Sequence, residues 1–253
     1  MRILVTNDDG IGAGGLLALV RELSSLGEVA VVAPERQQSA AGHGITLHKP
    51  LRMDPIRLDA PVLEAFATNG TPADCVILAT ANDRPTPDLV VSGINAGTNL
   101  AEEVLYSGTC SAAMEAALLG IKAFAISVSE YYDPLFEPAA QYAHDLAARM
   151  LQSDLPDDIF LNVNVPNLAS DRLGPPLLTR LGRRRYINVL ERRTDPRGRD
   201  YYWFSGEPTE CDCAEGTDIA AVQAGRISVT PVYFDLTWHG DAQRLADLAG
   251  VGG

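Results

Sequence analysis

The sequence has no long hydrophobic run. Its longest largely apolar stretches, residues 62–67 and 123–128, are far shorter than the roughly 20 residues that a membrane-spanning helix needs. Met1 is followed by one arginine and then by a strand-like segment that Asp8 and Asp9 interrupt, a pattern unlike that of a secretory signal peptide. We therefore expect no membrane partner.

Cysteine is scarce, with four residues in a chain of 253. The four follow no spacing typical of a zinc site or a disulfide framework, and Cys211-x-Cys213 lacks a second pair. With 46% hydrophobic and 21% charged residues, the chain can build a core without covalent links. We predict that all four residues (Cys75, Cys110, Cys211 and Cys213) are reduced thiols in a cytoplasmic protein.

Positive charge is also in short supply, because 33 acidic residues outweigh 20 basic ones and give a formal net charge of −13. Long nucleic acids need a basic surface that neutralises their phosphates, so we do not expect such a partner. A small phosphorylated ligand stays compatible if a local cation offsets the repulsion. The one basic cluster (Arg180, Arg183, Arg184, Arg185, Arg192 and Arg193) is either a solvated face or a rim that attracts an anionic substrate or clamps a subunit interface.

Strand-like and helical segments alternate over the first two thirds of the chain, as a parallel sheet requires. The expected strands are residues 1–6, 28–33, 62–68, 88–92, 123–129 and 159–165. The expected helices are residues 15–26, 72–81, 111–119 and 139–151, the second beginning after Thr71 as N-cap.

After about residue 175 the pattern changes. Residues 177–193 and 201–205 read as strands joined by a turn at 194–198, and a short helix that opens at Thr217 precedes a strand at 226–233. The hairpin has too little core of its own, so we predict that its aromatic residues (Tyr201, Tyr202, Trp203 and Phe204) pack on a partner subunit.

These patterns predict one α/β domain over residues 1–253. Its core, about residues 1–176, would be a Rossmann-like, three-layer parallel sheet. A C-terminal β-hairpin and helix extension, about residues 177–253, would serve in oligomerisation.

Two adjacent carboxylates, Asp8 and Asp9, directly follow the first predicted strand. Open α/β sheets bind their ligands at the carboxyl ends of the strands. Unpaired neighbouring carboxylates repel each other, so the pKa of one rises unless a cation keeps both ionised. We interpret the pair as metal ligands.

The glycines after Asp9 permit other interpretations. Gly10, Gly12 and Gly15 match the dinucleotide-binding fingerprint, and Glu35 lies near the place of a ribose-binding acid, which would suit an NAD(P)-dependent oxidoreductase. Two uncompensated carboxylates facing a pyrophosphate argue against that alternative. In a third interpretation the acids only cap the following helix, which leaves the second carboxylate unexplained.

Two later segments strengthen the metal interpretation. Residues 38–43, in the long loop 34–61 after the second strand, offer a hydroxyl, and residues 91–99 form a strand that ends in a Gly/Asn-rich turn at the same sheet edge. Carboxylates, a hydroxyl and an amide carbonyl make an all-oxygen set, which favours Mg²⁺ or Mn²⁺ over zinc.

A fourth segment supplies an anion site. Ser107, Gly108 and Thr109 lead into a helix, so free N–H groups lie at a helix N-terminus. Ser107 or Thr109 could equally be an ordinary N-cap, and a cap and an anion site are compatible. A divalent metal beside an anion site suggests phosphate-ester chemistry.

The chain carries a series of motifs that resembles the SurE family of stationary-phase survival nucleotidases. The matching motifs run in family order and cover nearly the whole chain: residues 4–10, 38–43, 69–74, 92–99, 106–109, 112–115, 215–218, 228–231 and 235–237. The resemblance implies a metal-dependent phosphatase on a Rossmann-like core that acts on 5′- and 3′-nucleoside monophosphates, with short polyphosphate as a further substrate of some members. It also implies homodimers or homotetramers that form through C-terminal elements.

The resemblance places the site residues as well. The family's metal ligands fall on Asp8, Asp9, Ser39 and Asn95, which would hold one Mg²⁺ or Mn²⁺ per subunit, and its phosphate contacts fall on Asn99, Ser107, Gly108 and Thr109. We expect Asp8 or Asp9 to be the general base, whereas His43 is either the proton donor to the leaving alcohol or a structural residue. A non-catalytic nucleotide sensor is the remaining alternative.

Overall fold

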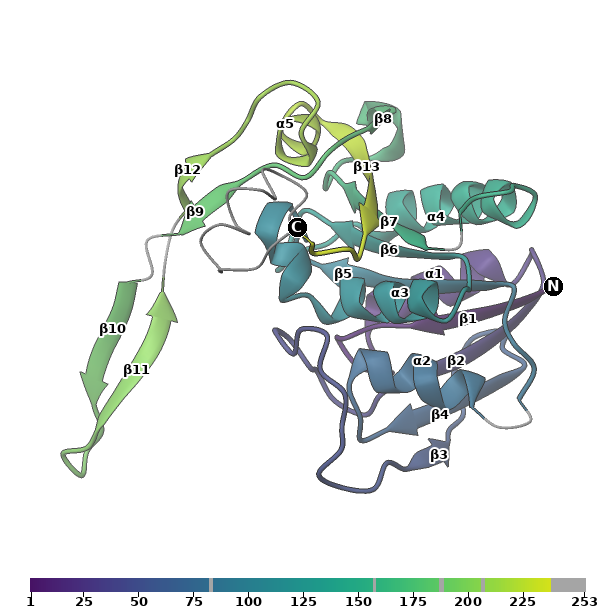
Figure 1. Ribbon diagram of the computed structural model, residues 1–253, viewed down its shortest axis with the longest axis horizontal. Coiled ribbons are helices and arrows are strands. Elements are labelled where there is room, and N and C mark those ends of the chain that lie inside the picture. The colour runs from purple at the N-terminus through teal and green to yellow at the C-terminus, as the bar shows by residue number, and fades with distance from the viewer. Residues whose placement is uncertain (82–83, 157, 187–188, 206–207, 238–253) are drawn as a thin grey trace, which may run out of the picture.

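A computed structural model describes residues 1–81, 84–156, 158–186, 189–205 and 208–237 of the chain. Its main sheet contains nine strands: β1 (Arg2–Thr6), β2 (Glu28–Pro34), β3 (Met53–Pro55), β4 (Glu64–Thr68), β5 (Leu89–Ala96), β6 (Ala123–Val128), β7 (Ile159–Val165), β8 (Gly174–Leu178) and β13 (Arg226–Tyr233). They lie in the order β3-β4-β2-β1-β5-β6-β7-β13-β8 (Figure 1).

The six predicted strands of the first two thirds form the parallel centre of this sheet, from β4 through β7. Antiparallel neighbours border this centre, because β3 pairs with β4 and β13 pairs with β7 in that sense. The apolar runs of β2 and β6 are buried almost throughout, which is typical of strands that are covered on both faces.

Helices cover both faces of the sheet, which confirms the three-layer prediction. Helices α1 (Gly14–Leu23) and α4 (Phe136–Leu151) contact each other on one face, and α2 (Pro72–Thr80) and α3 (Gly108–Leu118) do so on the other. Each layer has its own apolar cluster, with Leu16 and Leu19 of α1 in the first and Val76 of α2 in the second. In the described residues, no helix combines the length and the apolar character needed to cross a membrane.

Helix starts follow the sequence closely. Thr71 caps α2, accepting from the Asp74 N–H at 3.1 Å while its own N–H donates to the Asp74 carboxylate at 2.8 Å. Helix α3 begins at Gly108 rather than at Ser111 as predicted, because Ser107 acts as the N-cap and accepts from the Cys110 N–H.

The predicted strand over residues 177–193 is wrong as a single element. The chain forms β8, then leaves the sheet, and forms β9 (Arg184–Tyr186) and β10 (Val189–Thr194). The cause is Asp218, at the start of α5 (Asp218–Gln223), which bonds the backbone of Arg180 and Gly182 and so diverts the chain. Strands β8 and β13, both beyond residue 176, are part of the main sheet. Residues 238–253 of the predicted extension lie outside the described residues.

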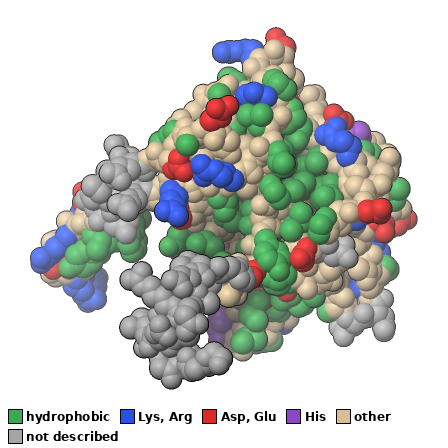
Figure 2. All heavy atoms as spheres, turned by 45° about the horizontal axis from the view of Figure 1, so that its top comes forward, with side chains coloured by type: hydrophobic (Ala, Val, Ile, Leu, Met, Phe, Trp, Pro, Cys, Tyr) green, Lys and Arg blue, Asp and Glu red, His purple; other side chains and the backbone are tan. Residues whose placement is uncertain are grey.

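A hairpin projects from the body of the molecule (Figure 1). It consists of β10 and β11 (Asp200–Ser205), and β12 (Pro208–Cys211) pairs with β9 at its base. We call the β10–β11 hairpin the arm. Trp203 and Phe204 are 59% and 85% exposed, and Figure 2 shows hydrophobic and basic side chains side by side on it. The aromatic hairpin is confirmed as an element, whereas its packing on a partner stays a prediction.

The prediction of four reduced thiols is wrong for two of them. Cys211 and Cys213 form a disulfide across a single intervening residue. Cys75 and Cys110 are free and buried, and burial raises the pKa of the Cys110 thiol to about 12. The spacing of the cysteines did not predict this bridge, because a single intervening residue is not a typical disulfide separation. At the end of β12 the Cα atoms of the two cysteines lie 5.5 Å apart, which allows the bond.

Candidate active site

A polar pocket of about 240 Å³ opens at the carboxyl ends of β1 and β5. It is lined by six of the eight predicted site residues: Asp8, Asp9, Ser39, Asn95, Asn99 and Ser107. The remaining two, Gly108 and Thr109, lie directly behind Asp8. The structure therefore brings together residues that are up to 101 positions apart in the chain.

The turn after β1 presents the two carboxylates. The buried side chain of Asn7 spans the turn, donating to the Gly10 carbonyl at 3.0 Å and accepting from the Gly10 N–H at 3.2 Å. Gly10 has φ +100°, a conformation that favours glycine. Asn7, which belongs to the first matching motif but had no role assigned from the sequence, thus fixes the loop in which Asp8 and Asp9 lie.

Asp8 is the buried member of the pair, with 5% exposure. Burial raises the pKa of its carboxyl, although hydrogen bonds from the Thr109 hydroxyl and from the backbone N–H groups of Thr109 and Gly108 oppose the shift. The Thr109 Oγ1 donates to Asp8 Oδ1 at 2.5 Å. The N-terminus of α3 therefore faces the Asp8 carboxylate, and the phosphate role predicted for these N–H groups stays a prediction.

Asp9 is only partly buried and lies nearer the opening. Burial, and after it the charge of Asp8, raises the pKa of Asp9 to about 6, while the Ala96 N–H opposes the shift. This N–H donates to Asp9 Oδ2 at 3.4 Å. Neither Asp8 nor Asp9 accepts a hydrogen bond in a cap of α1, whose N-cap is Ala13 without a side-chain bond, so the capping interpretation is wrong.

The loop that carries Ser39 is held against this turn by backbone bonds. The Gln38 N–H donates to the Asp8 carbonyl at 2.8 Å, and the Gly42 N–H donates to the Tyr106 carbonyl at 3.0 Å. Ser39 itself is exposed and lines the pocket. The long loop between β2 and β3 thus brings Ser39 to the pocket that Asp8 and Asp9 line, and its role as a metal ligand stays a prediction.

Asn95 and Asn99 reach the pocket from the end of β5 and the turn after it. Asn95 Nδ2 donates to the Gly97 carbonyl at 2.8 Å, which leaves the amide oxygen of Asn95 for a ligand. Asn99 is anchored by a buried network, since its Nδ2 donates to Ser127 Oγ and its N–H donates to Asn164 Oδ1, both at 2.8 Å.

The donor set fits a hard divalent cation. Two carboxylates with raised pKa values share the pocket, and Glu103 adds a third acid to its lining. Among the described residues that line it, none is lysine, arginine or histidine. No group of three His, Cys, Asp or Glu side chains suited to a metal occurs in the described part of the chain, so a metal here would depend on the Ser39 hydroxyl and the Asn95 amide as well.

Sequence reasoning missed several lining residues. Gln37, Thr98, Glu103, Tyr106 and Tyr131 also line the pocket. Gln37, Thr98 and Tyr106 adjoin or fall within matched motifs, whereas no local pattern marked Glu103 or Tyr131. Glu103 lies in the 3₁₀ helix η1 (Ala101–Leu105), where it accepts from the Leu100 N–H and pairs with Arg184 at 2.8 Å.

Two of the three glycines of the dinucleotide fingerprint, Gly10 and Gly15, have local explanations. Gly10 forms the turn, and a Cβ at Gly15 would collide with the Ile94 carbonyl, so glycine is needed for α1 to approach β5. Glu35 lies beside Arg36 on the surface and does not line the pocket. The pattern therefore reflects helix–strand packing here.

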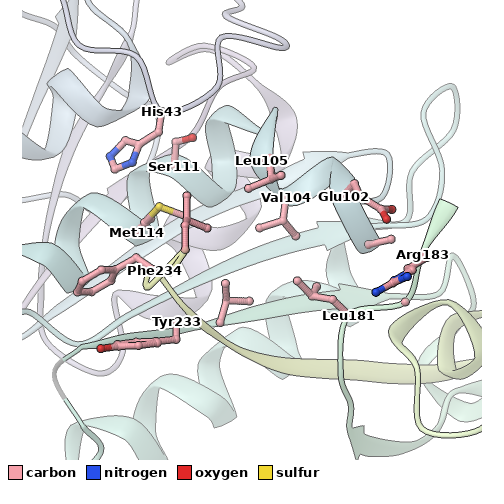
Figure 3. Close-up of a pocket in the computed structure, with 14 residues that line it drawn as sticks. His43, Glu102, Val104, Leu105, Ser111, Met114, Leu181, Arg183, Tyr233 and Phe234 are labelled. Atoms are coloured by element: carbon pink, nitrogen blue, oxygen red, sulfur yellow. The ribbon is translucent and has the colours of Figure 1, made fainter. Parts of the chain in front are cut away.

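A second, larger pocket of about 480 Å³ is lined by other residues of η1, among them Val104 and Leu105 (Figure 3). It is mainly apolar, with Val104, Leu105 and Met114 facing Leu181 and Phe234. His43 lines this pocket rather than the polar one, and its Nε2 lies 2.7 Å from Glu115 Oε2. Because the acid pair belongs to the smaller pocket, we place the candidate chemistry there, and the His43–Glu115 contact favours a structural role for His43.

The chain is similar to known proteins over its whole length. The family model described as survival protein SurE matches residues 3–188. The 5′-nucleotidase SurE of Heliobacterium modesticaldum is 48% identical over 253 residues, covering 100% of this chain and 93% of that protein. The 5′-nucleotidase SurE of Moorella thermoacetica is 50% identical over 247 residues, covering 97% of this chain and 95% of that protein.

A solved structure shares the fold. The crystal structure of the SurE protein from Aquifex aeolicus superposes with a TM-score of 0.84 at 39% identity and covers 98% of this chain and 100% of that one. The agreement includes the α/β three-layer arrangement that the sequence predicted.

Proposed function

Since this chain belongs to the SurE family, we propose that it is a metal-dependent 5′-nucleotidase, which hydrolyses nucleoside 5′-monophosphates to nucleoside and phosphate. The observation that carries the proposal is the pair Asp8 and Asp9, two acids with raised pKa values in a pocket whose described lining holds no basic side chain. The names of the relatives support the reaction, and the pocket supports the metal.

Four residues would hold the ion: Asp8, Asp9, Ser39 and Asn95. A Mg²⁺ or Mn²⁺ ion bound there supplies Lewis acidity toward the phosphate and lowers the pKa of a bound water. The Thr109 hydroxyl and the α3 N-terminus hold the Asp8 carboxylate in one orientation. This pre-organisation reduces the cost of assembling the ligand set.

The other polar residues have roles toward the substrate. Asn99 would donate to a phosphate oxygen, because its Nδ2 carries a second hydrogen besides the one given to Ser127. The Ser107 side chain lines the pocket beside it. Asp9, the more exposed of the two acids, would accept the proton of the attacking water.

We also propose 3′-nucleotides and short polyphosphate as further substrates. Both share the phosphoryl group that the pocket would bind, so they follow from the same chemistry. The oxidoreductase alternative is weakened, because Gly10 serves the turn after β1, Gly15 serves the packing of α1, and Glu35 does not line the pocket. The location in the cytoplasm stays a prediction from the sequence.

We further propose a homodimer or homotetramer that covers the arm. Trp203 and Phe204 of β11 are exposed and lie opposite Glu191 and Leu190 of β10. The next two pairs along the hairpin join Tyr202 to Arg192 and Tyr201 to Arg193, so the arm presents a mixed aromatic and charged surface suited to a second copy. Light scattering on the wild type and on Trp203→Ser/Phe204→Ser should show a smaller assembly for the variant. An unchanged mass would contradict this role of the arm.

The test of the reaction is phosphate release from AMP with Mn²⁺, with and without EDTA. Turnover should require the metal, and Asp8→Asn should lose most of it while keeping the wild-type circular dichroism. Asp171→Asn, an exposed acid in the 3₁₀ helix η2 (Ser170–Arg172), is the matched control and should keep full activity. AMP binding without phosphate release would support the sensor alternative, and full activity of Asp8→Asn would refute the metal set.

A further inference from the structure

The disulfide between Cys211 and Cys213 is not explained by the reaction or by stability. It lies at the end of β12, and both cysteines are exposed. A disulfide stabilises a fold mainly by restricting the unfolded chain, and this effect grows with the length of the closed loop. With a sequence separation of 2, this bridge closes a very short loop, so its effect on the unfolded chain is small compared with that of an ordinary disulfide.

Two arginines contact Asp212, the residue between the two cysteines, in a segment that also carries the acids Glu210 and Glu215. Asp212, between the two cysteines, donates its N–H to the Arg183 carbonyl at 2.8 Å and accepts from Arg180 Nη1 at 3.3 Å. The pKa of Asp212 is lowered first by the Ala214 N–H, then by its hydrogen bond with Arg180, and also by the charges of Arg180 and Arg183. Cationic surroundings also stabilise a thiolate, the reactive form of cysteine.

The remaining thiols of the chain lack these properties. Cys75 and Cys110 are buried, and burial raises the pKa of both thiols. Buried thiols with raised pKa values exchange slowly, because the thiolate is rare and inaccessible. Thiol chemistry on the folded chain is thus confined to residues 211 and 213.

We propose that Cys211 and Cys213 form a redox-active dithiol/disulfide site that exchanges with small thiols such as glutathione. A glutathione thiolate attacks one sulfur, the S–S bond breaks, and the other cysteine leaves as a thiolate. A second glutathione then resolves the mixed disulfide. The protein bridge gains two electrons and two protons, and two glutathione molecules become one glutathione disulfide.

The site has a structural output close by. Through Asp212 the bridge is tied to Arg183, which lines the apolar pocket together with Leu181 (Figure 3). When the bridge opens, the Asp212 peptide is no longer held between two linked cysteines. The Asp212 N–H should then exchange with deuterium faster in the reduced protein, whereas amides of α3 should not change.

The test uses the intact native protein in glutathione redox buffers, followed by rapid alkylation and peptide mass spectrometry. We expect reversible labelling of Cys211 and Cys213 as the ratio of reduced to oxidised glutathione changes, and no labelling of Cys75 or Cys110. In Cys211→Ser the single remaining thiol should retain a glutathione adduct, since no second cysteine can resolve it.

Controls separate exchange from unfolding. Circular dichroism should be identical at every buffer ratio, and the Cys211→Ser/Cys213→Ser variant should show no redox-dependent change in Asp212 exchange. A bridge that opens only in denaturant would overturn the proposal, and so would thiols that never pair in excess glutathione disulfide. Neither outcome depends on whether the chain hydrolyses nucleotides.

Discussion

Replacing Asp218 with alanine should destabilise the chain strongly. Asp218 is fully buried, and its carboxylate accepts three backbone N–H bonds of 2.8 Å, from Gly182, Ile219 and Ala101. The alanine variant leaves the N–H groups of Gly182 and Ala101 buried and unpaired. Each unpaired group costs about 1–3 kcal/mol, so the free energy of unfolding should fall by about 2–6 kcal/mol. This is a large share of the roughly 5–15 kcal/mol that stabilises a typical domain.

The assay is urea unfolding followed by circular dichroism. If the dependence of the unfolding free energy on urea is the same in both proteins, the shift of the unfolding midpoint measures the change in stability. Asp195→Ala is the matched control, because Asp195 also accepts two backbone N–H bonds but lies in the exposed turn of the arm, where water can replace it. The Asp195→Ala substitution should lower the free energy of unfolding by less than about 1 kcal/mol. Equal midpoint shifts for the two variants would refute the argument from burial.

Two further predictions concern the acid pair. Gly108→Ala places a Cβ 2.7 Å from the Asp8 Cβ, so it should displace Asp8 and reduce kcat/KM for AMP by about tenfold or more. Gly12→Ala is the control, because its Cβ meets nothing within 4 Å, and it should leave kcat/KM unchanged. The second prediction concerns Asp9 without metal, where the pKa of its carboxyl is raised to about 6. Between about pH 4 and 6 the folded state therefore binds more protons than the unfolded state. The contribution of Asp9 to the free energy of unfolding is thus present at low pH and is lost as the pH rises. In EDTA, the wild type should therefore lose thermal stability relative to Asp9→Asn as the pH rises from 4 to 7. Mn²⁺ should stabilise the wild type more as the pH rises. A difference in melting temperature between the two proteins that does not vary with pH would contradict the raised pKa of Asp9.

Sequence reasoning placed the parts of the site that short motifs encode. Asp8 and Asp9 follow a buried strand, and the topology of a parallel sheet brings the end of β5 beside them, so the shared edge was predictable. Ser39 was predictable as part of a long loop between sheet strands, since such loops usually carry function.

Long-range contacts decided what the sequence did not reveal. The break between β8 and β9 depends on Asp218, which lies 36 residues after Gly182 and has no local signature as an acceptor. The orientation of the α3 N-terminus toward Asp8 depends on a close approach that only Gly108 permits. The Cys211–Cys213 bridge depends on the backbone geometry at the end of β12, which no spacing rule describes.

The position of β13 has a consequence for biosynthesis. This strand, the last described element, lies between β7 and β8 and pairs with both of them. Until the ribosome has released residues 226–233, β7 keeps one edge without a partner and β8 has no place in the sheet. The nascent chain must therefore hold an open, apolar strand edge while the whole arm is being made, and an mRNA truncated before β13 would encode an aggregation-prone product.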